Sequence, residues 1–373
     1  MPKLLMVSTI ATTLATFLLP HVQYMRQQGW AVDGVANGIL KNSNCVDTFN
    51  TVYDIEWSRS PFDIKNMVKA VKRIRRIVDD GKYDIVHVHT PIASAVARFA
   101  LRHTVKAGKI KMVYTAHGFH FYKGASLLNW LIYYPIEKFL SRYTNVLITI
   151  NKEDYNIARS KMYAKKTEYI PGVGIDIEKL QNIKVDRNKK RAELGIPQDA
   201  FTLISVGELN KNKNHKAVIK ALKDLAKNNN IHYIIVGQGP LYKYLLDLAS
   251  EYGLKDKVHL LGFRSDVIEL LKSSDCFVFP SWREGLPVAL MEAMVCGLTV
   301  VCSNVRGCSD LACQYPNAFM ILPFDINSII QGINSALLTS AKRCSYKRII
   351  ASVDTKNITQ LMQKIYFDVV NPI

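Results

Sequence analysis

The sequence predicts an α/β protein with two doubly wound domains that face each other across a cleft. Short β-branched runs alternate with helical patterns along the 373-residue chain, which is typical of parallel sheets covered by helices on both faces. This alternation runs once, stops after Ile170, and then runs again. The length supports the same division, because 373 residues can form two cores of ordinary size.

In the first half, six strands are expected where β-branched and aromatic residues cluster between turn-forming residues. They are Leu4–Ser8, Ala31–Ala36, Thr51–Ile55, Ile85–His89, Met112–Ala116 and Val146–Ile150. After the first strand we expect a loop over Thr9–Thr13 and a helix over Leu14–Gln28, which Gly29 would end. The uncharged segment between Lys3 and Arg26 also fits the core of a signal peptide. Its threonines and the lack of a clean small-residue cleavage site favour the strand.

Six further strands are expected in the second half. They are Thr202–Val206, Tyr233–Val236, Val258–Leu261, Cys276–Phe279, Thr299–Cys302 and Phe319–Leu322. The connection between the halves contains Ile170-Pro-Gly-Val-Gly-Ile-Asp176 and then Asn188-Lys-Lys-Arg191, a composition typical of an exposed linker that would extend to about Pro197. The predicted domains are residues 1–175 and 176–356, and a last helix over residues 357–373 would pack back onto the first domain.

The net charge of +18 is concentrated in residues 1–200, which hold 30 Lys/Arg and 17 Asp/Glu, a net of +13. One predicted helix there carries an apolar stripe that includes Val68 and Ile74, and it is crowded with basic residues: Lys65, Lys69, Lys72, Arg73, Arg75 and Arg76. Such a helix favours peripheral docking on the anionic inner face of the plasma membrane. The other interpretation is a solvated helix face packed on a sheet. No nucleic-acid module signature is present, so nucleic acid is not an expected partner.

Cysteine usage and hydropathy favour a cytoplasmic protein. The seven cysteines form no CxxC pair and no Cys/His zinc pattern, which indicates reduced thiols. Beyond the N-terminal run, no segment is long and apolar enough to be expected to span a bilayer. No DxD pair is present either. A diphosphate leaving group would therefore need fixed cations to offset its charge, which predicts no essential metal.

Two carboxylates stand eight residues apart in Ser281-Trp-Arg-Glu-Gly-Leu-Pro-Val-Ala-Leu-Met-Glu-Ala-Met294. Glu284 would lie in the loop after a buried strand, and Glu292 on the helix that follows, with Pro287 in its first turn. Open α/β sheets bind ligands at the carboxyl ends of their strands. The pair could therefore bind two groups of hydroxyls on one elongated ligand. The alternative is a helix-capping Glu and a solvated Glu.

Three Gly-containing turns follow predicted strands of the second half. Val206-Gly207-Glu208-Leu209-Asn-Lys211-Asn-Lys213 precedes a helix, so that backbone amides, the helix dipole and Lys could bind a diphosphate. It lacks the P-loop pattern. Val236-Gly-Gln-Gly-Pro240 is a turn or a ligand loop, and the backbone of Leu261-Gly-Phe-Arg264 could hold a base, with Phe or Arg stacking on it.

Four histidines lie at or beyond the ends of two first-half strands. His87 and His89 alternate with Val, so both point to the same face. Metal binding is possible for two such residues, but without a nearby carboxylate pair we expect hydrogen bonding at a crevice wall. His117 and His120 follow the next strand in a Gly-containing loop. One of them could contact a reacting hydroxyl or sugar, and local loop bonding is the alternative.

Taken together, these motifs resemble the family-4 retaining glycosyltransferases, whose GT-B architecture has two facing Rossmann-like domains. The resemblance covers essentially the whole chain. Its most specific part is E-x7-E from Glu284 to Glu292, supported by Thr-x-His-Gly at 115–118, Gly-x-Leu-x-x-x-Lys at 207–213 and Gly-x-Gly-Pro at 237–240. The segments Gly207–His215 and Ser303–Asp310 are similar to the bacterial capsule and exopolysaccharide branch.

The resemblance implies a function for each motif residue. His117 would contact the donor sugar near the reacting carbon, Glu284 the sugar hydroxyls, and Lys213 the diphosphate, and these three are the expected catalytic residues. Glu292 would hold the ribose. The expected donor-binding residues are Gly207, Lys211, Lys213, Gly237, Phe263, Arg264, Glu284, Gly285, Leu286, Val288 and Glu292. The expected acceptor-side residues are Thr12, Thr13, His89 and His120.

Three positions depart from the family pattern. Glu208 stands where the family usually has an Arg that binds phosphate, and a carboxylate cannot replace that contact, so Lys211 is a candidate substitute. Ile10-Ala-Thr-Thr13 replaces the usual Gly-Gly of the first loop, which points to a different acceptor pocket. Gly172 replaces the usual Asn in the linker motif.

The resulting expectation is a metal-independent hexosyltransferase that needs no cofactor and uses a UDP-sugar as co-substrate. The acceptor would be lipid-linked or an oligosaccharide, in bacterial surface polysaccharide synthesis, with retention at the anomeric carbon. The first domain would bind the acceptor and the second the nucleotide sugar. The alternatives are a sugar-nucleotide epimerase on the same fold and a non-catalytic protein that binds sugar nucleotides. A dinucleotide oxidoreductase is disfavoured, because G-x-G-x-x-G does not follow the first strand.

Overall fold

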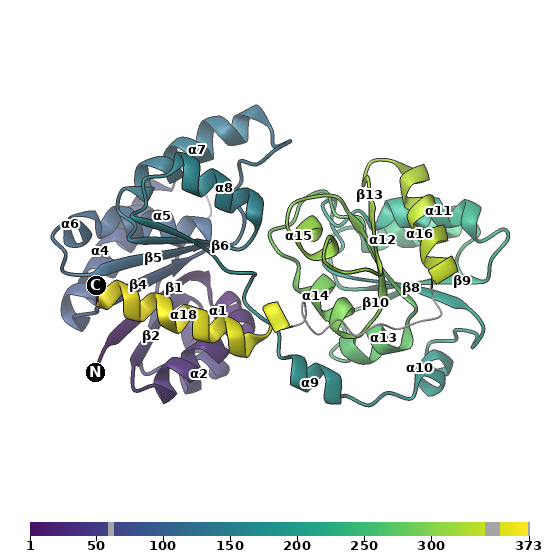
Figure 1. Ribbon diagram of the computed structural model, residues 1–373, viewed down its shortest axis with the longest axis horizontal. Helices are drawn as coiled ribbons and strands as arrows, with labels where there is room; N and C mark the ends of the chain where they lie inside the picture. Colours follow the sequence, from purple (N-terminus) through teal and green to yellow (C-terminus); the bar gives the residue numbers. More distant parts are fainter. Residues whose placement is uncertain (59–62, 340–350, 372–373) are drawn as a thin grey trace. The chain divides into compact units, whose positions relative to one another are not determined.

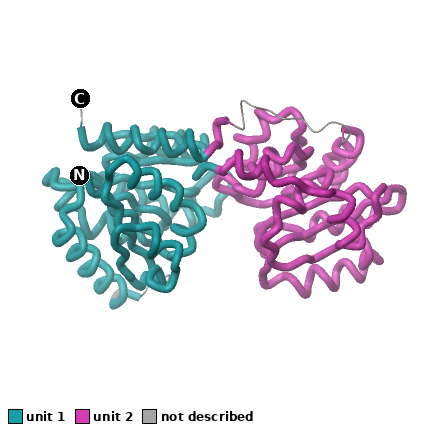
Figure 2. Tube along the Cα trace, turned by 90° about the horizontal axis from the view of Figure 1, so that it is seen from below, with its two compact units in different colours: residues 1–174, 355–373 teal, residues 175–354 magenta. Residues whose placement is uncertain are grey.

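A computed structural model describes residues 1–58, 63–339 and 351–371 (Figure 1). The chain divides into two compact units (Figure 2). Unit 1 holds residues 1–174 together with 355–373, and unit 2 holds residues 175–354. Among the described residues, no helix is both long and apolar enough to cross a membrane.

Unit 1 is built on a seven-stranded parallel sheet in the order β3-β2-β1-β4-β5-β6-β7. Its strands are β1 (Lys3–Ile10), β2 (Ala31–Asn37), β3 (Val52–Asp54), β4 (Ile85–His89), β5 (Lys111–Ala116), β6 (Val146–Thr149) and β7 (Lys166–Tyr169). Its helices are α1 (Ala11–Phe17), α2 (Leu19–Gln27), η1 (Ile39–Lys41), α3 (Ser43–Thr48), α4 (Ile64–Gly81), α5 (Pro91–Ala100), α6 (Arg102–Lys106), α7 (Leu127–Ser141), α8 (Lys152–Lys161) and α18 (Thr355–Val370).

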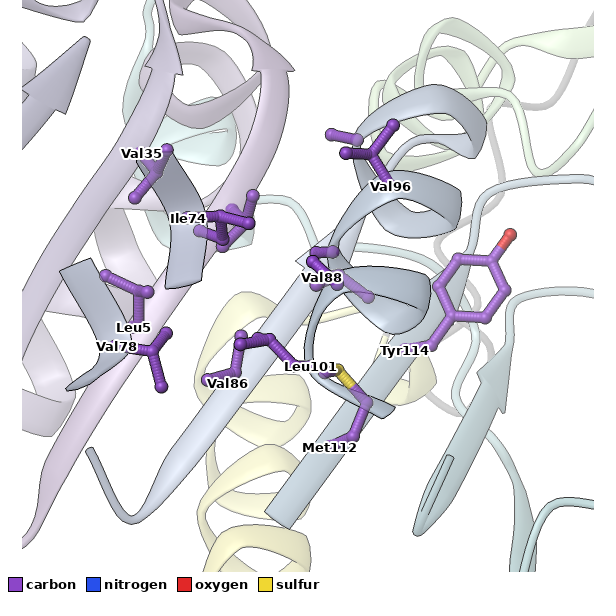
Figure 3. Close-up of a cluster of buried hydrophobic side chains, with 14 of the residues drawn as sticks. Leu5, Val35, Ile74, Val78, Val86, Val88, Val96, Leu101, Met112 and Tyr114 are labelled. Carbon is purple, nitrogen blue, oxygen red and sulfur yellow. The ribbon is translucent and has the colours of Figure 1, made fainter. Parts of the chain in front are cut away.

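Helices cover both faces of this sheet. Successive residues of a strand point to opposite faces, and apolar residues on both faces are buried beneath the helices. On β1, Leu5 and Val7 join the core beneath α4 and α5, part of which Figure 3 shows. Leu4 and Met6 join the core beneath α1, α2 and α18. The C-terminal helix α18 buries Ile358, Met362, Ile365 and Tyr366 there, far in sequence from the strands it covers (Figure 1).

Unit 2 is built on a six-stranded parallel sheet in the order β10-β9-β8-β11-β12-β13. Its strands are β8 (Phe201–Val206), β9 (Ile231–Val236), β10 (Val258–Gly262), β11 (Cys276–Phe279), β12 (Thr299–Ser303) and β13 (Ala318–Ile321). Its helices are α9 (Ile177–Asn182), α10 (Arg187–Glu193), α11 (His215–Leu225), α12 (Tyr242–Glu251), α13 (Val267–Ser273), α14 (Val288–Val295), α15 (Cys308–Ala312) and α16 (Ile326–Thr339). In both sheets the strand order reverses direction next to the first strand of the unit, which is where doubly wound sheets bind ligands.

Three local expectations about secondary structure are wrong. No loop covers Thr9–Thr13, because β1 continues to Ile10 and α1 begins at once. The single helix expected over Leu14–Gln28 is broken at Leu18, because Pro20 in the first turn of α2 has no N–H to donate to a carbonyl of the preceding turn. Strand β7 was not expected. Its sequence Lys166-Thr-Glu-Tyr169 lacks an apolar run, because it is an edge strand without a fully buried residue.

The segment expected to be an exposed linker also folds differently. Helices α9 and α10 lie inside it and belong to unit 2. Arg191 is buried: it donates to the carbonyl oxygens of Ser273, Gln198 and Ala200 and forms an ion pair with Asp275 at 2.6 Å. A cation with this many partners at a buried position is structural. The charged run Asn188-Lys-Lys-Arg191 therefore anchors α10 instead of joining two domains.

Replacing Arg191 with Ala should destabilise unit 2 by about 3 kcal/mol, because it leaves Asp275 and three carbonyl groups short of a buried donor. The Lys189→Ala variant on the same helix is the matched control, since that side chain is exposed, and its cost should stay within about 0.5 kcal/mol. Urea denaturation followed by circular dichroism measures both. Equal stability of the two variants would contradict an anchoring function for Arg191.

Candidate active site

The loops at the carboxyl ends of β8, β9 and β10 pack directly on one another. The backbone N–H of Gly207 donates to Val236 and that of Gly237 donates to Gly262. Gly237 has φ of 147°, and a Cβ added there would lie 2.0 Å from the Gly207 carbonyl oxygen. Only glycine permits this approach. The close packing brings the Gly207 loop and the Gly237 loop to the same edge of the sheet.

Lys213 and Glu284 meet at this edge, with Nζ and Oε1 2.7 Å apart. Lys213 comes from the loop after β8 and Glu284 from the loop after β11. The ammonium group also lies 4.6 Å from the centroid of the Phe279 ring. The side chains are 20% and 11% exposed, so the pair is largely shielded yet still open to a ligand.

Two asparagines position these residues: Asn210 braces the Lys213 loop internally, and Asn212 joins it to the Glu284 loop. The Asn210 Oδ1 accepts from the Lys213 backbone N–H at 3.0 Å, and the Asn212 side chain donates to the Arg283 carbonyl at 2.9 Å. In return, the Trp282 N–H donates to the Asn212 carbonyl at 2.9 Å. Sequence reasoning missed both asparagines, although they lie inside the segment that was singled out for its lysines.

Glu292 lies just over one helical turn into α14. Its carboxyl is mostly buried, and burial raises its pKa from 4.5 to about 7. The helix begins at Val288, so Pro287 precedes the first turn instead of lying within it. Glu284 and Glu292 are thus presented by one loop-helix segment of unit 2.

The loop after β12 supports the same segment from the other side. The Arg306 Nε donates to the Glu284 carbonyl at 3.1 Å. Gly307 has φ of 75°, and a Cβ there would lie 2.1 Å from the Gly285 carbonyl oxygen. This contact fixes Gly285 and the buried Leu286 beside the ion pair. Arg306 was not among the expected site residues, although it lies in Ser303–Asp310, a segment noted for its family resemblance.

The remaining donor-side candidates differ in whether their side chains are free to contact a ligand. Lys211 is exposed, and Phe263 is 76% exposed just beyond β10. The Arg264 guanidinium, by contrast, is held by Asp266 at 2.7 Å and by Glu193 at 3.1 Å. Glu208 is exposed and accepts from the Asn210 side chain at 2.9 Å. Lys211 and Phe263 therefore remain available to a ligand, whereas Arg264 already has two carboxylate partners.

In unit 1, three histidines form a stack of neighbouring rings at the ends of β4 and β5, in which His87 and His89 are buried and His117 is half-buried. The rings of His87 and His89 have centroids 4.0 Å apart, and His89 Nδ1 lies 3.1 Å from His117 Nε2. His87 is held by the Tyr366 hydroxyl at 2.6 Å and by Thr115 Oγ1 at 2.8 Å. Burial lowers the pKa of each histidine, that of His117 to about 4. The stack is therefore neutral at physiological pH.

The other acceptor-side candidates lie apart from this hydrogen-bonded chain. Thr12 and Thr13 are on α1, where Thr12 is exposed. The ring of His120 stacks on Tyr133 with centroids 4.5 Å apart. His21, which was not predicted, lines the same small cavity as the histidine stack, and its ring is held by the Val173 carbonyl at 3.0 Å. Within the described part of the chain, no group of three His, Cys, Asp or Glu could hold a metal ion.

Comparison with known proteins assigns the chain to a family. The family model described as "Glycosyl transferases group 1" matches residues 186–351, and "Glycosyl transferase 4-like" matches residues 3–151. EpsD of Bacillus subtilis (strain 168) is 36% identical over 322 residues, which are 86% of this chain and 83% of EpsD. The chain is a family-4 glycosyltransferase.

A named Escherichia coli relative and a solved structure agree with this assignment. UDP-Gal:alpha-D-GlcNAc-diphosphoundecaprenol alpha-1,3-galactosyltransferase from Escherichia coli is 32% identical over 319 residues, 83% of this glycosyltransferase and 80% of the relative. The crystal structure of Anabaena HepE in complex with UDP-glucose is similar over 98% of this chain and 99% of HepE, with a TM-score of 0.76 at 20% identity. The expected GT-B fold and enzyme class are confirmed, and the comparisons support a transferase and not an epimerase.

The pKa of Glu292 predicts how the stability of this glycosyltransferase depends on pH. Because the native carboxyl binds its proton more tightly than the unfolded one, its contribution is full below about pH 4.5 and is lost as the pH rises to about 7. The Glu292→Gln variant stays neutral. Relative to wild type it should gain on the order of 3 kcal/mol between pH 4.5 and pH 8.

Urea denaturation at a series of pH values measures this difference, with Glu251→Gln as the control because Glu251 is an exposed carboxyl of the same unit. The control should track wild type at every pH. A difference between Glu292→Gln and wild type that does not change with pH would contradict a raised pKa.

Proposed function

We propose that this glycosyltransferase moves a hexose from a UDP-sugar to a lipid-linked or oligosaccharide acceptor in bacterial surface polysaccharide synthesis, with retention at the anomeric carbon. The observation that carries the proposal is the Lys213–Glu284 pair at the carboxyl edge of the unit 2 sheet, with Glu292 on the adjoining helix. The named Escherichia coli relative supports a UDP-sugar donor and a diphosphate lipid acceptor. HepE supports UDP-glucose as a ligand of this fold.

The way in which the UDP-sugar would bind follows from the charges of Lys213 and Glu284. A bound diphosphate is a stronger partner for the Lys213 ammonium than one carboxylate, because it carries more negative charge. Lys213 would then stabilise the charge that develops on the departing UDP. Glu284, released from the lysine, would accept hydrogen bonds from the sugar hydroxyls. Glu292 would bind the ribose hydroxyls.

Transfer of the sugar from UDP to the acceptor can proceed without a nucleophilic side chain from the protein. The bond between the anomeric carbon and the UDP oxygen breaks, and the acceptor hydroxyl oxygen bonds to that carbon on the same face. The hydroxyl proton passes to the departing phosphate oxygen. His117 is neutral, so it would act by hydrogen bonding near the reacting carbon, and the His89 ring would orient it through their 3.1 Å contact. No step requires a metal ion.

The test of this proposal is acceptor-dependent UDP release from a panel of UDP-, GDP- and ADP-sugars, each with and without a membrane lipid extract. Release from a UDP-sugar only when lipid is present supports transfer. Release of UDP without any acceptor would point to an epimerase, and tight nucleotide binding without release would point to a non-catalytic protein.

The Lys213→Met variant should lose kcat/KM in that assay by about 100- to 1,000-fold, the usual cost of removing one group that stabilises transition-state charge. The control Lys255→Met removes an exposed lysine of the same unit that lies outside the candidate site and has no ion pair within the described ranges, and its loss should stay below tenfold. Similar losses of kcat/KM in both variants would contradict the proposal that Lys213 stabilises the charge on the departing UDP.

We also propose that α4 docks unit 1 on an anionic membrane surface. Lys65, Lys69 and Arg76 are exposed, and no basic residue of this helix forms an ion pair with a carboxylate in the described part of the chain. Each such cation near an anionic bilayer contributes about 1 kcal/mol. These uncompensated charges are available to lipid headgroups.

Replacing Lys65, Lys69 and Arg76 together with Gln should weaken binding to vesicles rich in phosphatidylglycerol by about 100-fold, which three such contributions amount to. The control replaces Lys216, Lys220 and Lys223 of α11, which are also exposed, with Gln and removes the same charge. Vesicle sedimentation at low salt measures both. Equal loss in the two triple variants would indicate a general charge effect and would contradict docking through α4.

A further inference from the structure

A groove of about 750 Å³ lies between α4, α5 and α7 on the outside of unit 1. Ten of its twelve lining residues are apolar, and the other two are Lys72 and Arg75. The volume is within the range of small-molecule sites, which are mostly apolar and carry a few polar groups. None of the motif residues lies in it, so it is separate from the site described above.

The groove is apolar although it is open to solvent. Val68 is 48% exposed, Phe99 44%, Ile136 47% and Phe139 44%. The apolar surface continues along α7, where Leu128 is 63% exposed outside the groove. Contiguous apolar surface of this kind marks a binding site in soluble proteins. The underside of α7 is fixed, because Glu137 pairs with the buried Arg98 at 2.7 Å, so the groove has a defined wall.

Charge complementarity selects the class of ligand. The Arg75 Nε donates to the Ala100 carbonyl at 2.9 Å, which holds the guanidinium beside the groove. Lys72 is exposed and has no carboxylate partner among the described residues. An amphiphile with a long hydrocarbon chain and an anionic head matches both the apolar walls and the basic margin.

We infer that this groove binds the isoprenoid chain of a lipid-linked diphosphate acceptor, with Lys72 and Arg75 facing the diphosphate. The inference rests on the proposed lipid-linked acceptor and adds to it a place for the lipid. A branched hydrocarbon chain can fill the space among Val68, Phe99 and Ile136, and the two cations offset the charge at its head. The groove would thereby select acceptors by their lipid.

The probe is farnesyl diphosphate, titrated in calorimetry into the full-length protein without membranes, with inorganic diphosphate as the comparison. Farnesyl diphosphate should bind at least tenfold more tightly than inorganic diphosphate. Ile136→Glu and Phe99→Glu should each weaken binding of farnesyl diphosphate at least tenfold. The matched control Leu128→Glu, exposed on the same helix but outside the groove, should bind as wild type does.

Two further measurements separate the outcomes. Circular dichroism checks that each variant is folded, which the exposure of Ile136 and Phe99 favours. If farnesyl diphosphate binds no better than inorganic diphosphate, or if Ile136→Glu and Leu128→Glu behave alike, the inference is overturned in favour of general bilayer insertion. A dimer that Ile136→Glu dissociates, without binding of farnesyl diphosphate, would overturn it in favour of self-association.

Failure of the proposed function has a different signature. An enzyme that transfers sugar to no lipid extract, while farnesyl diphosphate still binds and Ile136→Glu abolishes that binding, would remove the lipid-linked acceptor and keep the groove as an isoprenoid site. In an active enzyme, Ile136→Glu should raise KM for a polyprenyl-diphosphate-linked sugar at least tenfold and leave KM for the UDP-sugar unchanged.

Discussion

The proposed donor site depends on one ion pair, between Lys213 and Glu284. The two side chains come from loops that follow different strands, and a 2.7 Å contact joins them. An unpaired charge at a largely shielded position is costly, so each side chain stabilises the other. A ligand with anionic and hydroxyl groups can replace the pair by supplying both partners. In the proposed function, this contact therefore both holds the two side chains in place and is exchanged for contacts to the donor.

The loops around this pair leave little room for other residue types. Gly237 and Gly307 each lie where a Cβ would overlap the carbonyl oxygen of a neighbouring loop. Asn212 connects the two loops by a hydrogen bond to the Arg283 carbonyl, and Asn210 fixes the Lys213 loop by accepting from the Lys213 N–H. The result is a surface of backbone amides and short side chains. Such a surface can approach a phosphate closely, which bulky side chains would prevent.

The sequence predicted the strands well where they are buried, because continuous apolar runs such as Cys276–Phe279 have few other interpretations. The edge strand β7 and the break at Leu18 were missed, since a polar strand and a proline inside an apolar run carry weak or conflicting signals. Among the site residues, Glu284 and Lys213 were recognisable from their motifs. Tyr366, which holds His87, lies 279 residues away in the chain, and only tertiary structure brings the two together.

Glu208 shows how a departure from a family pattern can keep a site intact. Its carboxylate accepts from the Asn210 side-chain nitrogen, and the Asn210 side-chain oxygen accepts from the Lys213 N–H. An amide can face either way unless a neighbour distinguishes its two ends. By accepting from the nitrogen, Glu208 directs the oxygen toward the turn that carries Lys213. The carboxylate thus contributes to the proposed diphosphate site by orienting the lysine loop, although it cannot contact phosphate itself.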